Sequence, residues 1–366
     1  MTTRLLRFVA AAALVAIAVG LVAASGFSAG KKSAAPTVSL MVGGIDKQIY
    51  LPYQLAQNLG FYKKYGVNVQ LSTESAGGVG AEDALAAGQV DMAGAWYVHT
   101  IDFQQHGKNV IGVVQLSGAP GERIMCAKGS GITSPAQWAG KAVGVTSLGS
   151  GTDDLTLYMA KRFGVSSSQF TRLGVGAGST FVSALQHGKI VCGMTTQPTV
   201  NAIEKQDIGY SAFDLATPKG VKRWLGGFWP TASVLVQKSW GDSHKAEVQK
   251  VVNALVATMH WIHTHTAAQI AAHMPTDFVS NQLTTKADYV NALAKDKSQF
   301  LPNGIMPSTG PKVVYDVEKF AGKITGSVSL PSTYTNAYAI KANQLLGYIK
   351  KNCKPATAKK CQTKKK

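Results

Sequence analysis

The chain has 366 residues, with 37 Lys and Arg, 19 Asp and Glu, and a formal charge of +18. Only 15% of the residues are charged and 45% are hydrophobic, which excludes an intrinsically disordered chain. The 38 glycines follow no three-residue period, which excludes collagen. A chain of this length forms one large or two medium domains.

Most of the positive charge lies at the two ends of the chain. Residues 1–32 carry four Lys and Arg, residues 350–366 carry eight Lys, and neither segment contains an acid. Subtracting 4 and 8 from +18 leaves +6 for residues 33–349. The body is only mildly basic and no RNP, zinc-finger or basic-helix pattern is present, so we expect no nucleic-acid partner.

The N-terminal segment has the layout of a secretory signal. Arg4 and Arg7 precede an apolar run over residues 8–22, and small residues allow cleavage after Ala24 or Ala29. We therefore expect a signal peptide over residues 1–29 and a periplasmic or other extracytoplasmic location. The alternative is an uncleaved anchor, because residues 8–27 are just long enough to span a bilayer.

Export permits disulfides among the four cysteines. Cys126 and Cys192 lie in apolar, strand-like runs, and we expect them to be buried as small hydrophobic residues. Cys353 and Cys361 could close a small loop in the basic tail over residues 350–366. No CxxC and no Cys/His set with zinc spacing occurs, and His260 and His263 lie on an expected outer helix, so no metal site is predicted.

The elements alternate between strands and short helices from residue 37 onward. We expect strands at 38–42, 67–71 and 90–93, with helices at 51–59 and 81–87, each helix being followed by Gly60 or Gly88. This alternation is typical of βαβ units and a mainly parallel sheet.

The same pattern occurs a second time. Ala84, Leu85, Gly88 and Val90 match Ala184, Leu185, Gly188 and Ile190 at a constant offset of 100 residues. The upstream segment 38–60 resembles 143–164 in the same way. We therefore predict an α/β protein with two similar lobes, which begin near residues 37 and 141.

The last third differs from the repeat. A strand is expected at 231–236, and helices follow from residue 243 onward, at 287–293, 313–320 and 336–349. We expect these helices to cover the sheet of the first lobe, which requires the chain to cross between the lobes near 120–130 and near 228–236. Two such crossings are a candidate hinge.

Three ordered motifs resemble those of a known family. The segment 55–69 contains Leu-Gly-Phe-Tyr and Gly-Val-Asn-Val, 83–93 reads Asp-Ala-Leu-Ala-Ala-Gly-Gln-Val-Asp-Met-Ala, and 132–145 contains Ile-Thr-Ser-Pro and Gly-Lys-Ala-Val-Gly-Val. They are similar to motifs of the nitrate/sulfonate/taurine-type solute-binding proteins of ABC importers, which are related to thiamine-pyrimidine synthases. The resemblance covers roughly residues 37–350.

This resemblance implies a type II periplasmic binding protein fold with two lobes around a cleft. Lobe 1 would comprise 37–125 and 231–349, and lobe 2 would comprise 126–230. The family's function implies a binding protein, usually monomeric, that delivers a small molecule to an ABC permease without a cofactor. Contact with the membrane would be made only through the permease or an uncleaved N-terminus. The ligand would be a sulfonate, a carboxylate, or an aromatic or heteroaromatic compound.

Ligands of open α/β sheets bind beyond the carboxyl ends of the strands, where loops present backbone N–H groups that favour anions. The strongest candidate is the loop 146–152, because its glycines allow close approach and its hydroxyls donate. The candidate ligand-binding residues of this loop are Ser147, Ser150, Gly151 and Thr152. The loops after the expected strands of lobe 1 add Asp46, Gln48, Gly77, Gly78, Trp96 and Tyr97.

Three further candidates come from lobe 2 and the second crossing: Thr196, Gln197 and Trp229. Relatives often have an aromatic and an acid where this chain has Thr196 and Gln197, so that contact does not carry over cleanly. No Arg occurs in the candidate loops, although Arg is the usual bidentate partner of a sulfonate or carboxylate. Aromatic side chains with Asp46 and Gln197 would also suit a planar, hydrogen-bonding molecule.

Two other functions remain as alternatives. One is a ligand-sensing domain that is not coupled to transport. The other is an enzyme similar to the thiamine-pyrimidine synthases, whose relatives carry a cysteine-rich motif and cofactor-binding His and Lys. No cysteine cluster, nucleophile elbow or P-loop occurs in this chain, so no catalytic residues are predicted and we expect a binding protein rather than an enzyme.

Overall fold

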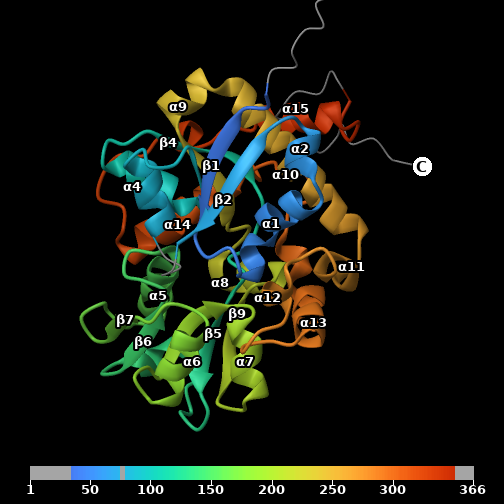
Figure 1. Cartoon of the computed structure of the whole chain (residues 1–366). Coiled ribbons are helices and arrows are strands. Elements are labelled where there is room, and N and C mark those ends of the chain that lie inside the picture. The colour runs from blue at the N-terminus through green and yellow to red at the C-terminus, as the bar shows by residue number, and fades with distance from the viewer. Residues whose placement is uncertain (1–33, 75–78, 351–366) are drawn as a thin grey trace, which may run out of the picture. The chain divides into compact units, whose positions relative to one another are not determined.

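The computed structural model describes residues 34–74 and 79–350, which contain two five-stranded sheets (Figure 1). The first sheet has the strand order β2-β1-β3-β10-β4. Its strands are β1 (Thr37–Val42), β2 (Asn68–Thr73), β3 (Met92–Trp96), β4 (Val110–Gln115) and β10 (Ala232–Gln237). The central strand β3 is buried along its whole length because neighbours cover both its edges and both its faces.

The second sheet repeats this arrangement, with the order β7-β6-β8-β5-β9. Its strands are β5 (Glu122–Ala127), β6 (Ala142–Val145), β7 (Thr171–Gly174), β8 (Cys192–Thr196) and β9 (Gly209–Leu215). In each sheet three strands are parallel, β2-β1-β3 in one and β7-β6-β8 in the other. The next strand, β10 or β5, runs antiparallel to both of its neighbours. The internal repeat predicted from the sequence is therefore confirmed.

Helices alternate with the strands along the chain, as predicted. Those of the first sheet are η1 (Gln48–Tyr50), α1 (Leu51–Asn58), α2 (Phe61–Lys64), α3 (Gly80–Ala86) and α4 (Val98–Gln105). Those of the second sheet are η2 (Pro135–Trp138), α5 (Gly151–Arg162), α6 (Ser179–Gln186), α7 (Thr199–Lys205) and α8 (Pro218–Leu225). Gly60 and Gly88 both have positive φ, which a side chain would disfavour, and each follows its helix where predicted.

The C-terminal third is helical, as expected. It comprises α9 (Lys238–Ser243), α10 (Lys245–Thr264), α11 (Ala267–Ala271), α12 (Thr276–Val279), α13 (Lys286–Asp296), η3 (Lys297–Gln299), α14 (Gly310–Ala321), η4 (Leu330–Ser332) and α15 (Ala337–Leu345). Helices α10 and α15 pack on one another and on β4 of the first sheet, but α14 packs on α5 of the second. Helices α10 and α15 thus pack against the first sheet as expected, and the contact of α14 with α5 is an addition that was not expected.

The chain passes between the sheets in two segments, one between β4 and β5 and the other between α8 and β10. These segments are hydrogen-bonded to one another. The Trp229 amide donates to the Gly118 carbonyl (3.1 Å), and the Leu116 amide donates to the Ala232 carbonyl (2.8 Å). The predicted lobe boundary at residue 126 falls inside β5, which pairs in the second sheet from Glu122 onward. The division into lobes with a hinge remains a prediction.

Cys126 and Cys192 are buried, as expected, but they are also joined to one another by a disulfide. They lie opposite each other on the neighbouring strands β5 and β8, a pairing that the repeat alone did not indicate. The predicted signal peptide and the Cys353–Cys361 loop lie outside the described residues. Within the described ranges, no helix is long and apolar enough to cross a membrane.

Candidate functional site

A small cavity lies where the carboxyl ends of the parallel strands of both sheets meet. Its remaining space is about 20 Å³, enough for one or two water molecules. The first sheet and its helices contribute one wall, and the second sheet contributes the other. The lining residues are Lys47, Ile49, Tyr50, Glu82, Trp96 and His99, facing Glu122, Thr146, Ser150, Gly151 and Thr152.

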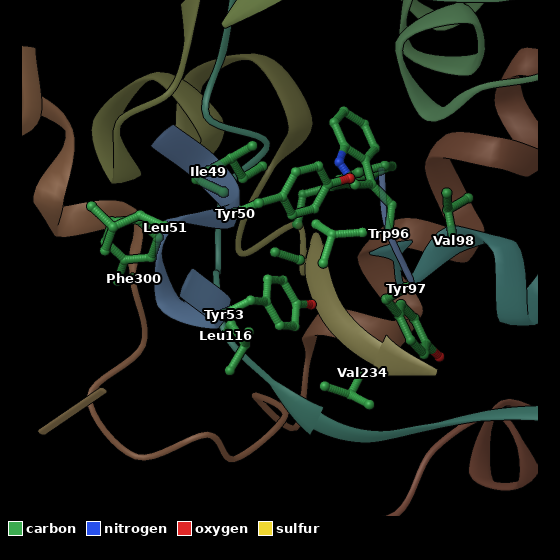
Figure 2. Packing of buried hydrophobic residues seen from close by; sticks show 14 of the residues in the cluster. Ile49, Tyr50, Leu51, Tyr53, Trp96, Tyr97, Val98, Leu116, Val234 and Phe300 are labelled. Carbon is green, nitrogen blue, oxygen red and sulfur yellow. The ribbon is translucent and has the colours of Figure 1, made fainter. Parts of the chain in front are cut away.

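Two aromatic side chains form the wall that belongs to the first sheet. Trp96 ends β3 and is only 6% exposed, and Figure 2 shows it pointing toward Tyr50 from η1. The rings of Trp96 and Trp229 pack edge to face with centroids 5.5 Å apart, which fixes the position of Trp96. Trp229 does not itself line the cavity, but it supports the ring that does.

The second sheet approaches Trp96 through a glycine. A Cβ atom at Gly151 would lie 2.0 Å from Trp96 Cε3 and 2.5 Å from Cζ3, so the Trp96 ring lies directly against the backbone at the start of α5. No larger residue fits there without displacing the ring. The glycine in the loop 146–152 therefore permits the close approach that the sequence analysis expected of it.

The hydroxyl groups of this loop bond mainly to one another. Thr146, Ser150 and Thr152 form a triangle of hydroxyl oxygens with separations of 2.8–3.0 Å. Thr152 Oγ1 also accepts from the Thr146 amide (3.0 Å), and Ser150 Oγ donates to the Ser147 carbonyl (2.7 Å). The loop is thus a preformed, rigid wall.

The first sheet places a charged network beside Trp96. His99 Nε2 lies 3.0 Å from Glu82 Oε1, and its Nδ1 lies 3.3 Å from Asp102 Oδ2. Burial alone would lower the pKa of His99, but the two carboxylates raise it well above its usual range. His99 is therefore a cation held between two acids, and it fixes the orientation of the Glu82 carboxylate.

A second acid, Glu122, reaches the cavity from the other sheet. It is the first residue of β5, and because β5 is antiparallel, its start lies at the edge where the parallel strands end. Burial raises the pKa of Glu122 to about 8, and the positive charges of Lys47 and Arg123 limit the increase. The Lys47 ammonium donates to the Gly43 carbonyl (2.9 Å), and burial lowers its pKa.

Two buried carboxylate oxygens in the cavity walls have no hydrogen-bond partner among the described residues. They are Glu82 Oε2 and Glu122 Oε2, one from each sheet. An unpaired buried acceptor is costly, so each oxygen is a point at which a bound molecule with an N–H or O–H group would gain free energy.

A further acidic pair lies behind the loop, where α5 packs on α14. Asp154 and Glu318 are both fully buried, and Asp154 Oδ1 lies 2.9 Å from Lys323 Nζ. Burial raises the pKa of Asp154 to about 7, with Asp102 adding to the effect and Lys323 opposing it. Burial and the charge of Asp154 also raise the pKa of Glu318 well above its usual range.

The structure brings together some of the predicted site residues and separates others. Trp96, Ser150, Gly151 and Thr152 line the cavity, and Trp229 packs on Trp96. Asp46 is exposed, and Ser147 contributes its carbonyl to the loop. Gly77 and Gly78 lie outside the described residues.

The other four candidates are bonded away from the cavity. Tyr97 points away from Trp96 (Figure 2), and its hydroxyl lies 2.5 Å from that of Thr333. Thr196 donates to the Gly121 carbonyl (2.7 Å), and the Gln197 side chain accepts from the Asn201 amide (3.1 Å). Gln48 links to the Tyr289 carbonyl through its side chain (3.0 Å) and to the Gln197 carbonyl through its amide (3.2 Å).

Sequence reasoning missed several lining residues, chiefly Tyr50, Glu82, His99, Glu122 and Thr146. One signal was available for Glu122, because it begins an otherwise apolar run, Glu-Arg-Ile-Met-Cys-Ala. Glu82 follows the loop that was singled out for Gly77 and Gly78. His99 carries no local signal, since it is one polar residue in an ordinary helix.

The two sheets, with a cavity where the carboxyl ends of their parallel strands meet, have the type II periplasmic binding protein fold. The chain is similar to the alkanesulfonate-binding protein SsuA from Xanthomonas axonopodis pv. citri, solved with bound MOPS, with a TM-score of 0.65 and 15% identity. The similarity covers 82% of this chain and 98% of that one. A solved protein from Bordetella bronchiseptica RB50 has a TM-score of 0.78 and 27% identity, covering 85% and 98%.

A comparison of the sequence with models of known families identifies the family of this chain. The NMT1/THI5-like family matches residues 49–269, more than half of the chain, so the chain belongs to this family. It is similar to 4-amino-5-hydroxymethyl-2-methylpyrimidine phosphate synthase THI13 of Saccharomyces cerevisiae, with 29% identity over 148 residues. That match covers 40% of this chain and 42% of the yeast protein, so the chain matches about two fifths of the length of this curated relative.

Proposed function

We propose that this protein is an extracytoplasmic solute-binding protein that captures a small organic molecule in the cavity and delivers it to an ABC permease. The observation that carries the proposal is a cavity with walls from two sheets, lined by an aromatic ring, paired hydroxyls and buried charges. The binding-protein fold supports it. The N-terminal export signal expected from the sequence supports the location.

The mechanism follows from the two-walled geometry. A ligand held between Trp96 and Glu82 on one side and Glu122 and the loop 146–152 on the other would stabilise the arrangement in which the walls meet. A ligand shifts such an equilibrium only by binding the closed arrangement more tightly. The two hydrogen-bonded crossing segments would serve as the hinge, and the permease would recognise the closed form of the monomer.

A thermal-shift screen tests the proposal. The panel would contain nitrate, taurine, alkanesulfonates, aromatic carboxylates, pyrimidines, thiamine and riboflavin. A ligand at about 100 times its Kd adds roughly 2.7 kcal/mol to the free energy of unfolding, which raises the Tm by several degrees. The bound compound should be recovered unchanged after prolonged incubation.

An enzyme is the second candidate, because the yeast relative of the matched segment is named as a synthase. The same incubation distinguishes the two functions, since conversion of a bound compound would contradict a simple binding protein. Among the described residues no group of three His, Cys, Asp or Glu could hold a metal ion. A ligand-sensing domain is the remaining alternative, and ligand uptake by cells that lack the protein would favour it.

A further inference from the structure

The chemistry of the cavity narrows the class of ligand, if the cavity binds the solute as proposed above. Among the described residues, two buried polar atoms of the cavity wall lack a partner, Glu82 Oε2 and Glu122 Oε2, which are acceptors when the carboxyl groups are ionised, and both residues are only 3% exposed. They come from opposite walls. A molecule that satisfies both must therefore present donors in two directions.

The side-chain donors that an anion would need are largely engaged. Two cationic side chains line the cavity: Lys47, which donates to the Gly43 carbonyl, and His99, which lies between two carboxylates. Just before α5, the Gly149 amide donates to Asp153 Oδ2 (2.9 Å), so this N–H group of the loop is already used by the protein's own carboxylate, outside the residues that line the cavity. The hydroxyls of the loop also bond to one another.

The aromatic side chains of the cavity wall favour a flat group. The Trp96 ring is held by Trp229 on one side and by the backbone of Gly151 on another, and Tyr50 points toward it (Figure 2). Cations bind well against the faces of Trp and Tyr, and planar cations stack on them. The remaining space of about 20 Å³ admits only a compact group, and the two walls must move apart slightly to hold more than one or two atoms the size of a water molecule.

We propose that the ligand carries a compact, planar organic cation of the amidinium or guanidinium class. Its N–H groups donate on one side to Glu82 and on the other to Glu122, and its flat face lies against Trp96. The proposal rests on the solute-binding function proposed above. It differs from that function in excluding sulfonates and carboxylates as the group held at this point.

Glu122 also gives the proposal a distinctive pH dependence. Its pKa of about 8 means that the carboxyl is mostly protonated at neutral pH, whereas a bound cation favours the ionised form. The charged groups that face it are Lys47 and Arg123, and Glu82 and His99 line the same cavity. Binding therefore releases a proton, and the affinity should rise with pH up to about 8.

Three matched compounds of nearly the same shape provide the test. Acetamidinium offers only donors, acetamide offers one donor group and one acceptor, and acetate offers only acceptors. Calorimetry on the full chain at pH 8.5 should give at least tenfold tighter binding for acetamidinium than for acetamide, and no heat for acetate. Guanidinium should bind like acetamidinium. The affinity for acetamidinium should fall about tenfold or more at pH 6.5.

Glu122→Gln is the informative variant, because it keeps the size of the side chain and replaces an acceptor with a donor. The variant should lower the affinity for acetamidinium about 10- to 100-fold, the usual range for a lost charge-assisted hydrogen bond. It should also remove most of the dependence of this affinity on pH. Glu247→Gln in the first turn of α10 is the matched control and should change neither the affinity nor the pH profile. The wild-type compound series remains decisive even if the variant does not fold.

The failures of the two proposals can be told apart. Binding of acetate, taurine or methanesulfonate that is lost in Trp96→Ala would refute the cationic ligand and leave the solute-binding function intact. The cationic-ligand proposal is also refuted, and the solute-binding function left intact, if acetamidinium binds but Glu122→Gln changes neither its affinity nor the pH dependence of that affinity. If no compound of either set binds, and mass spectrometry finds no small molecule released on denaturation, both proposals fail.

Discussion

Replacing Gly151 with Ala should separate the two walls of the cavity without unfolding either sheet. The new Cβ would lie 2.0 Å from Trp96 Cε3, far inside van der Waals contact, and Trp229 prevents the ring from moving away. Gly151 has no positive φ, so its backbone accepts Ala, which favours the first turn of α5. The conflict is therefore confined to the contact between the walls.

The size of the effect follows from the cost of overpacking a well-packed site. An extra methyl group that cannot be accommodated costs about 1–3 kcal/mol. If the walls separate to relieve it, closure becomes less favourable by the same amount, and ligand affinity falls about 5- to 150-fold. Trp96, now only 6% exposed, would meet solvent.

Two measurements that need no ligand check this result. The tryptophan emission should shift to longer wavelength and become more sensitive to acrylamide, and small-angle X-ray scattering should give a larger radius of gyration. Gly174→Ala at the end of β7 is the matched control, because its nearest non-bonded atom would be 3.5 Å away. Wild-type emission, radius and affinity in Gly151→Ala would refute the reasoning.

Three other predictions concern stability and the tail. Burial raises the pKa of Asp154 from 3.8 to about 7, so the folded state holds a proton that the unfolded state has lost between about pH 4 and 7, and stability should fall as pH rises through this window. Asp154→Asn should reduce the decrease in Tm between pH 5 and 8; an unchanged slope would contradict the assignment. Replacing Cys126 and Cys192 with Ala should lower the free energy of unfolding by about 4 kcal/mol, because the disulfide closes a loop across a sequence separation of 66. Thermal denaturation measures this, and a Tm within 2 °C of wild type would count against it. Deleting residues 351–366 should leave the affinity for acetamidinium unchanged by calorimetry, whereas a large loss would mean that the tail packs near the cavity.

Local sequence patterns predicted the elements well. Apolar strands followed by short helices that stop at Gly60 or Gly88 identified the βαβ units, and the offset of 100 residues identified the repeat, because both depend on neighbours along the chain. The candidate loop 146–152 was found for the same reason, since a strand that runs into glycines and hydroxyls is a local signal. β3 was misplaced by two residues at its start, since a fully buried strand has no alternation to mark its ends.

The charged part of the site was not predictable in this way. Glu82, His99 and Glu122 come from α3, α4 and β5, and only the packing of these elements brings them to one cavity. Trp96 and Tyr97 show that the sequence also could not predict which of two neighbouring residues faces the cavity. Neighbouring residues at a strand end point in opposite directions, and the sequence could not tell which one faces the cavity.

The sequence by itself therefore determined the α/β class, the duplicated architecture and one wall of the cavity, because local periodicity and turn residues predict each of them. Only the tertiary structure decided which acids are buried without a hydrogen-bond partner, which cysteines pair, and that α14 of the C-terminal third packs on α5. These depend on distances between residues far apart in the chain, and burial at such contacts is what raises the pKa of Glu122 and leaves its oxygen open to a ligand.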